Sequence, residues 1–523
     1  MSENTRVTKA AGVVSSATLL SRIFGYIRDM VIAAIFGAGF YSDAFVAAFR
    51  IPNLIRRLFG EGSLSISFVP VFTQYITEKG KDEAFEMARS AIKLLSVLLV
   101  IITVAGIALS PWIVHIFAPG FTGSPEKYAL TVVLTRIMFP YIFFICLVAL
   151  SMGILNVLGH FAAPALAPVF LNIAMIVSVT AVSIASTDPA NRVYGLAFGV
   201  VVGGCLQLAL QVPFLIKNGF YFWQKTAIWH SGLKRIVKLF FPAIFGSAVY
   251  QINTLVITLL ASIQSEGSVS YLYYADRLVQ FPLGIFAIAA ATALLPSISR
   301  QAAAKDMQAV RDSFAYTLKL VFFITIPAMV GLIVLRQPVV ALLFQRGAFG
   351  GEATLLTAKA VLYYSIGLWA VSGVRIIVFT LYALKDTKTP VYTAAISIMA
   401  NIILGVVLME PMGHAGLALA LSLASMLNFG LLMRSLNIKL GPLKQPGLAE
   451  FVCKNIICSV LMGTVVWTVA LYIIPPGTES LSGLIIGLLG SILTGLVIYG
   501  GFSIIFKTLD IKTVLNLGLF KRQ

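Results

Sequence analysis

Residues 10–36, AAGVVSSATLLSRIFGYIRDMVIAAIF, decide the class of fold. The stretch is long enough to cross a bilayer as one helix, which takes about 20 apolar residues. It nevertheless carries Arg22, Arg28 and Asp29. A charge at the centre of a membrane-spanning helix costs about 2.5–3.5 kcal/mol on insertion scales. The stretch therefore predicts a transmembrane helix in which the charges have a function.

Apolar stretches of this length recur to the end of the chain. Of its 523 residues, 59% are hydrophobic and only 11% are charged, whereas soluble proteins are about one quarter charged. The composition predicts an all-α polytopic membrane protein. Reading apolar runs between polar breaks predicts fourteen spans, near residues 10–36, 44–72, 90–118, 130–157, 164–186, 193–217, 236–263, 269–298, 313–335, 355–383, 390–409, 414–437, 450–474 and 481–506. No small-residue cleavage site follows the first span, so we expect it to remain in place.

The loops between the spans alternate in charge. Basic loops such as TEKGKDEAFEMARS, KDTKT and RSLNIKLGPLK alternate with cation-poor loops such as APGFTGSPEKY and PPGTES. The positive-inside rule places the basic loops and both termini in the cytoplasm. This distribution accounts for the net charge of +18, so we expect no nucleic-acid partner. In residues 220–229, FYFWQKTAIW, aromatic residues beside a lysine predict a short helix at the membrane interface.

Motifs for metal or nucleotide chemistry are missing from the sequence. The four histidines are isolated, and the four cysteines lie inside apolar spans, where cysteine behaves as a small hydrophobe. We therefore expect no disulfide, no metal site and no cofactor. The sequence has no phosphate loop of the G-x-x-x-x-G-K-[ST] type, so we expect no ATP hydrolysis by this chain.

A weak internal repeat divides the chain. Five pairs of identical residues have the same separation along the chain: Glu126/Glu352, Leu130/Leu356, Thr131/Thr357, Pro164/Pro390 and Pro70/Pro296. The repeat predicts two six-helix lobes in parallel orientation, residues 1–225 and 226–445, followed by two additional helices in residues 446–523. Substrate usually binds between such repeats near the middle of the membrane. Similar composition of apolar helices is the alternative explanation of the matches.

Charged residues within the spans are mostly cations. Those considered for a site lie in or beside the first, second and eighth spans: Arg22, Arg28, Asp29, Asp43, Arg50, Arg56, Arg57, Glu61, Asp276 and Arg277. Cations on other spans, such as Arg136 and Lys319, are expected to snorkel. Arginine binds phosphate oxygens in pairs and keeps its charge when desolvated. The excess of cations therefore predicts an anionic ligand, with phosphate favoured. Two alternatives remain open: Arg56 snorkels to the inner surface as an anchor, and Asp276 neutralises Arg277.

Several long blocks in this order resemble the MurJ (MviN) family of bacterial lipid II flippases. They are SRIFGYIRDMVIAAIFGAGFYSDAF, RIPNLIRRLFGEGSLSISFVPVF, FAPGF, FPYI, LNIAMI and YYADRLVQFPLGIF. The resemblance covers the first twelve spans. It implies the two-lobe fold of the multidrug/oligosaccharidyl-lipid/polysaccharide exporter superfamily, in the bacterial cytoplasmic (inner) membrane. It also implies that the last two spans and the second lobe form a groove for the lipid tail.

The resemblance further implies the substrate and its site. The substrate would be lipid II, the undecaprenyl-diphosphate-linked peptidoglycan precursor. The partners would be membrane lipids, with the cell-wall synthesis machinery as a further candidate. Matched by motif, the substrate-binding arginines are Arg22, Arg28, Arg56 and Arg277. The supporting residues in the same blocks are Asp29, Asp43, Arg50, Ser270, Asp276 and Gln280.

This sequence departs from the family at three positions. Some members carry a carboxylate where this chain has Gln280. Some members also hold sodium with acidic residues on the seventh and eleventh spans, where this chain has Asn253 and Asn401. The sequence therefore assigns no coupling ion.

The expected mechanism is alternating access around an arginine-lined cavity between the lobes. Because the cell interior is electrically negative, an anion that moves outward goes downhill by about 2.3 kcal/mol per charge per 100 mV. The membrane potential is thus an expected driving force. The alternatives are an exporter of another polyprenyl-linked saccharide or of drugs, and an integral-membrane polyprenyl-phosphate enzyme. The few acidic residues in the spans argue against the enzyme.

Overall fold

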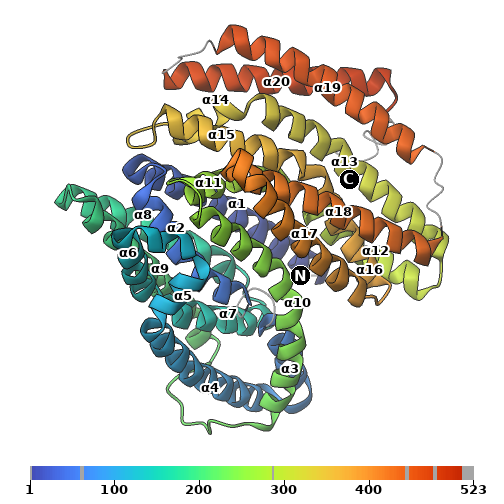
Figure 1. Cartoon of the computed structure of the whole chain (residues 1–523). Helices are drawn as coiled ribbons and strands as arrows, with labels where there is room; N and C mark the ends of the chain where they lie inside the picture. The colour runs from blue at the N-terminus through green and yellow to red at the C-terminus, as the bar shows by residue number, and fades with distance from the viewer. Residues whose placement is uncertain (1–2, 59–63, 285–287, 442–446, 475–479, 509–523) are drawn as a thin grey trace. The chain divides into compact units, whose positions relative to one another are not determined.

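The computed structural model describes residues 3–58, 64–284, 288–441, 447–474 and 480–508 (Figure 1). Within these ranges all long elements are helices, and no strand occurs, as the composition predicts. The chain divides by packing into two units. The first comprises Met1–Ser270 and Gly347–Phe349, and the second comprises Tyr271–Arg346 and Gly350–Gln523.

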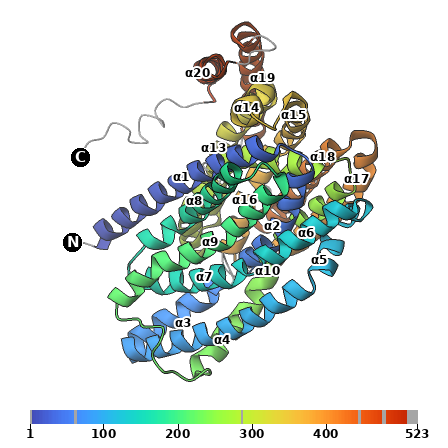
Figure 2. The ribbon, with the colours of Figure 1, turned by 90° about the vertical axis from the view of Figure 1, so that its left-hand side faces the viewer.

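The first unit contains ten α-helices and one short 3-10 helix within the described ranges. They are α1 (Glu3–Phe36), α2 (Phe40–Leu58), α3 (Leu64–Lys79), α4 (Lys81–Ala108), α5 (Ser110–Phe117), η2 (Pro119–Gly123), α6 (Pro125–Met138), α7 (Tyr141–Val157), α8 (Ala162–Ala185), α9 (Pro189–Lys217) and α10 (Ser231–Ser262). Helix α8 packs along α1 and α9 (Figure 2). Helix α2 packs on α6, and α10 packs on α2 and α3.

The second unit holds the remaining helices of the described chain. They are α11 (Ser268–Pro282), whose first three residues belong to the first unit, α12 (Ile288–Ala303), α13 (Met307–Val334), α14 (Arg336–Phe344), α15 (Gly351–Ile366), α16 (Leu368–Ala383), α17 (Lys388–Met412), α18 (His414–Leu440), α19 (Leu448–Ile473) and α20 (Leu481–Ile505). Helices α19 and α20 form a hairpin that packs on α13 (Figure 1).

The order of long and short helices occurs twice along the chain. A long helix, two helices of about half its length, a long helix and a short one follow each other in α1–α5 and again in α10–α14. The pair α6–α7 then corresponds to α15–α16, and the long pair α8–α9 to α17–α18. This order agrees with the repeat read from the sequence.

The lobe boundary at residue 225 stays a prediction. It falls in the segment that joins α9 to α10. Packing instead divides the chain after Ser270, because α10 lies against α2, α3 and α4.

Nine helices of the described chain are long and apolar enough to cross a membrane, or ten if the pair α15–α16, bent by 42°, is one span. Helix α4 illustrates why they need lipid: in its most apolar window only 17% of the residues are buried. Exposed apolar side chains such as Ile101 and Val104 therefore need an apolar solvent. The chain is a multi-pass membrane protein. The described helices do not confirm the count of fourteen spans, which stays a prediction.

Several predicted spans consist of two helices. The predicted span 44–72 contains α2 and α3, and in the predicted span 90–118 α4 ends at Ala108 and α5 begins two residues later. The stretch around residue 340, predicted as a loop, contains α14. Glu61, one of the charged residues of the second predicted span, lies outside the described residues.

The predicted interfacial helix in residues 220–229 is wrong, because no helix lies between α9 and α10. Side chains of α4 bind this segment instead. Lys93 Nζ donates to the Thr226 carbonyl at 2.6 Å, and Ser90 Oγ donates to the Ala227 carbonyl at 2.7 Å. Phe220 is fully buried. These contacts hold the segment along α4 in a non-helical conformation.

Candidate functional site

The charges of α1 form a buried network with α8. Arg28 Nε and Nη2 donate to Asp29 Oδ1 at 3.0 and 2.6 Å, and Arg28 Nη1 donates to Asn172 Oδ1 at 2.9 Å. Asn172 Nδ2 in turn donates to the Ser21 carbonyl at 3.2 Å. Arg28 and Asp29 are 5% and 2% exposed. Since a buried charge needs a partner, the network explains how α1 retains an arginine at this depth.

Arg22 differs from Arg28. It is half-buried, and no other described residue forms a hydrogen bond or ion pair with it. It lies two turns from Asp29 on the same helix. An arginine with this exposure and no partner among the described residues is available to an anionic ligand.

The arginines of α2 have separate surroundings. Arg50 Nη1 donates to Thr258 Oγ1 of α10, and Arg56 Nε donates to Asn53 Oδ1 of its own helix at 2.8 Å. Arg57 Nε is buried and has no hydrogen-bond partner within the described part of the chain. Arg50 therefore contacts another helix, whereas Arg56 contacts a residue of its own helix.

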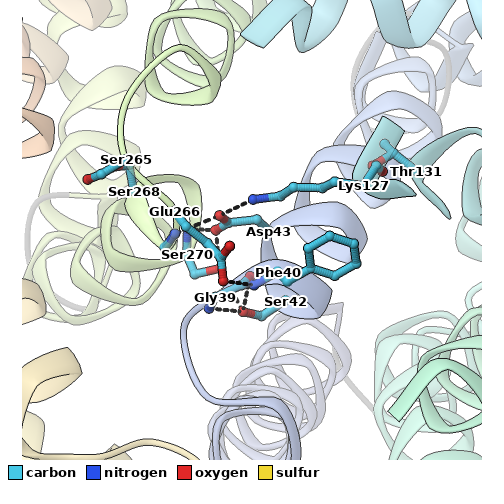
Figure 3. Close-up of polar contacts among 11 residues, drawn as sticks. Gly39, Phe40, Ser42, Asp43, Lys127, Thr131, Ser265, Glu266, Ser268 and Ser270 are labelled. Atoms are coloured by element: carbon cyan, nitrogen blue, oxygen red, sulfur yellow. Dashed lines mark hydrogen bonds and ion pairs between the residues drawn. The ribbon is translucent and has the colours of Figure 1, made fainter. Parts of the chain in front are cut away.

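Asp43, at the first turn of α2, is the centre of the densest polar cluster of this unit (Figure 3). Its Oδ2 accepts from Lys127 Nζ and from the Gly267 N–H, each at 2.8 Å. Its Oδ1 accepts from the Ser270 N–H at 2.9 Å and from Ser270 Oγ at 2.6 Å. The carboxylate thus joins α2 to α6 and to the segment that begins α11.

Lys127 was not among the residues selected from the sequence. It is 6% exposed, and its ammonium lies 4.6 Å from the centre of the Phe121 ring. Beside the ion pair, Glu266 Oε1 accepts from the Phe40 N–H at 2.9 Å (Figure 3). The sequence analysis placed Lys127 in the loop APGFTGSPEKY. Two features of the sequence could have indicated that Lys127 is buried. It lies one turn before an apolar run, and Asp43 on another span needs a cationic partner.

The remaining site residues lie in the second unit, on α11. Arg277 Nη2 donates to the Tyr273 hydroxyl at 3.1 Å, and the guanidinium lies 5.1 Å from the centre of that ring. Asp276 Oδ2 accepts from Gln280 Nε2, one turn further along. The amide at Gln280 therefore binds an acid, a contact that a carboxylate there would oppose.

Within the described ranges, three pairs of predicted site residues contact each other: Arg28 with Asp29, Asp43 with Ser270, and Asp276 with Gln280. No group of three or more His, Cys, Asp or Glu side chains is arranged to hold a metal ion within the described ranges. The chemistry offered by these residues is the binding of anions by guanidinium groups.

Comparisons with known proteins agree on one family. The family model described as lipid II flippase MurJ matches residues 32–481. A probable lipid II flippase MurJ of Vibrio cholerae is 40% identical over 445 residues, 83% of this chain and 83% of the relative. The lipid II flippase MurJ of Burkholderia cenocepacia is 37% identical over 432 residues, 82% of this chain and 83% of the relative.

Solved structures show the same relationship. A lipid II flippase MurJ in an inward closed conformation has a TM-score of 0.78 and 31% identity, and the match covers 94% of this chain and 98% of the other. An inward-facing MATE family multidrug transporter of the MOP superfamily has a TM-score of 0.67 at 16% identity, over 83% of this chain and 99% of the other. The second likeness shows the fold alone.

Proposed function

Since this chain belongs to the lipid II flippase MurJ family, we propose that it moves lipid II from the cytoplasmic to the outer leaflet by alternating access. The ligands of the diphosphate are Arg22, Arg28, Arg56 and Arg277. Flipping makes and breaks no covalent bond, so the proposal needs no catalytic residue and no cofactor.

The surroundings of Arg22 are the main support for the proposal that arginines bind the diphosphate. A half-buried guanidinium in an apolar helix is costly unless something compensates its charge. Within the described ranges no side chain does so, and a diphosphate would. Arginine offers two parallel N–H donors to phosphate oxygens, which a lysine cannot match.

Arg28 and Arg277 contribute as oriented donors. Arg28 is held by Asp29 and Asn172, and Arg277 by Tyr273. A side chain already held in one rotamer loses less conformational entropy when a ligand binds. In this proposal Asp29 and Asp276 orient the arginines, and Asp43, Arg50, Ser270 and Gln280 support the helices that carry them.

The proposal includes topology and driving force. The lobes are residues 1–225 and 226–445, residues 446–523 add the last helical pair, and both termini are cytoplasmic in the bacterial inner membrane. The membrane potential drives the diphosphate outward at about 2.3 kcal/mol per charge per 100 mV. Collapse of the potential with the pH gradient held should stop flipping; undiminished flipping would refute this part.

The arginine assignment is tested in cells depleted of their own lipid II flippase. Arg22→Ala should retain lipid II on the inner leaflet, with a loss of about 10-fold to 100-fold in flipping, the effect of one charge-assisted hydrogen bond. Arg22→Lys should restore only part of the rate. Arg434→Ala, at an exposed arginine of α18, is the matched control and should flip normally. Wild-type flipping by Arg22→Ala at normal membrane levels would remove Arg22 from the site.

A further inference from the structure

Pro327 interrupts the hydrogen bonds of α13 inside the second unit. The helix runs from Met307 to Val334 with the proline in its interior. Proline has no N–H, so the carbonyl four residues earlier, that of Phe323, has no backbone donor. The ring also pushes against that carbonyl. In a membrane no water replaces the missing donor, so another group must supply it.

The C-terminal hairpin supplies the missing donors. The Tyr499 hydroxyl of α20 donates to the Phe323 carbonyl at 2.6 Å. Asn455 Nδ2 of α19 donates to the neighbouring Phe322 carbonyl at 2.9 Å. The Tyr499 hydroxyl also lies within hydrogen-bonding distance of Asn455 Oδ1. One side chain from each helix of the hairpin thus binds the turn that precedes the proline.

These polar contacts lie in an apolar region. Asn455 is fully buried, and Tyr499 is 7% exposed. The Tyr499 ring lies 5.0 Å from the Phe323 ring, centre to centre, and Met462 and Val466 pack in the same cluster. A polar group left without a partner in such a place costs far more than it would at a surface.

We propose that Asn455 and Tyr499 are positioning residues for transport, which join the α19–α20 hairpin to the interrupted turn of α13. The interrupted turn is stable only while the hairpin supplies its donors, so the hairpin and this turn move together during the transport cycle. This inference rests on the proposed function, because its effect is on flipping.

The test compares Tyr499→Phe with the wild type in vesicles that contain purified protein and lipid II. The variant keeps the ring and removes only the hydroxyl. The orphaned Phe323 carbonyl should shift the equilibrium between joined and separated states by about 5-fold to 100-fold. We expect the initial flipping rate per folded protein to fall by about 5-fold or more. Tyr472→Phe on α19, where the side chain is 87% exposed, is the control and should leave the rate unchanged.

Pro327→Ala distinguishes a positioning role from general destabilisation. Alanine restores an N–H that can donate to the Phe323 carbonyl, so the hydroxyl of Tyr499 is no longer needed. In the Pro327→Ala background, Tyr499→Phe should lower the flipping rate less than it does in the wild-type background, because only Asn455 Oδ1 then loses a donor. An equal loss in both backgrounds would overturn the inference.

Different results would contradict the proposed function and the role of the α19–α20 hairpin. If the wild-type protein does not flip lipid II in these vesicles, the proposed function fails. If the wild type flips and Tyr499→Phe matches it per folded protein, the inference about the hairpin fails and the proposed function stands.

Discussion

Replacement of Asp43 by asparagine should strongly destabilise the first unit. Asp43 accepts four hydrogen bonds, from Lys127, the Gly267 N–H and both donors of Ser270. Asparagine has one acceptor oxygen. If that oxygen faces Lys127 and Gly267, its NH2 group faces the Ser270 N–H, and two donors oppose each other.

The charge adds to this loss. The Lys127 side chain is 8% exposed and the Asp43 side chain 2%, so the ammonium would remain buried without its counter-ion. Breaking a buried ion pair from one side costs about 3–5 kcal/mol. The orphaned N–H would cost about 1–3 kcal/mol by itself. The two losses concern one network and are not additive, so we expect about 3–5 kcal/mol for Asp43→Asn.

The companion variant is Lys127→Met. Asp43 would keep the donors of Gly267 and Ser270, so the cost should be smaller, about 1–3 kcal/mol. The double variant removes both charges and should be less destabilised than Asp43→Asn alone, because an ion pair replaced from both sides leaves no buried charge.

The assay is unfolding of the purified protein in detergent by denaturant or heat. Glu86→Gln, at an exposed acid on α4, is the control and should stay within about 0.5 kcal/mol of the wild type. The reasoning would be refuted if Asp43→Asn had the same unfolding midpoint as the wild type. It would also be refuted if the double variant lost the sum of the two single effects.

Three further changes follow from single contacts. Gly120→Ala should cost about 1–3 kcal/mol of unfolding free energy, because its Cβ would lie 2.1 Å from the Ser262 carbonyl oxygen; Gly123→Ala in the same turn meets nothing within 4 Å and should be neutral, and equal effects would contradict the packing. Burial alone would raise the pKa of Asp386, in the α16–α17 loop, but hydrogen bonds from Lys439 and Thr389 lower it from 3.8 to about 2. A lowered pKa stabilises the folded state above the unfolded value, and this is lost as pH falls through about 2. The melting difference between wild type and Asp386→Asn should therefore be constant from pH 8 to about 5 and shrink below about pH 4; a difference that grew in acid would contradict the sign. Replacement of the Arg28 partner on α8, Asn172→Leu, should slow flipping and lower the unfolding midpoint together, and a slowed rate with an unchanged midpoint would contradict a structural link between α1 and α8.

Much of the helical architecture is determined by local sequence. Whether a stretch can cross a membrane depends on its own length and hydropathy, so α4, α8, α9, α17, α18, α19 and α20 lie where the apolar runs predict them. The charges of α1 were visible for the same reason, because any charge in such a run stands out. The repeat was detectable since its members keep one interval along the chain.

The same local reasoning failed where tertiary contacts decide the backbone. Residues 220–229 have the composition of an interfacial helix, but Ser90 and Lys93 of α4 donate to carbonyl groups of this segment. Nothing within those ten residues could reveal these contacts.

The partners of the buried polar groups were decided only by the tertiary structure. The sequence shows Arg28, Asp43 and Pro327, each of which needs a compensating group because a buried charge or carbonyl cannot stay unsatisfied. The sequence does not show which group compensates each of them, because Asn172, Lys127 and Tyr499 lie on helices far away along the chain. The need for a partner is a property of one residue in an apolar solvent, whereas the identity of the partner is a property of how helices pack.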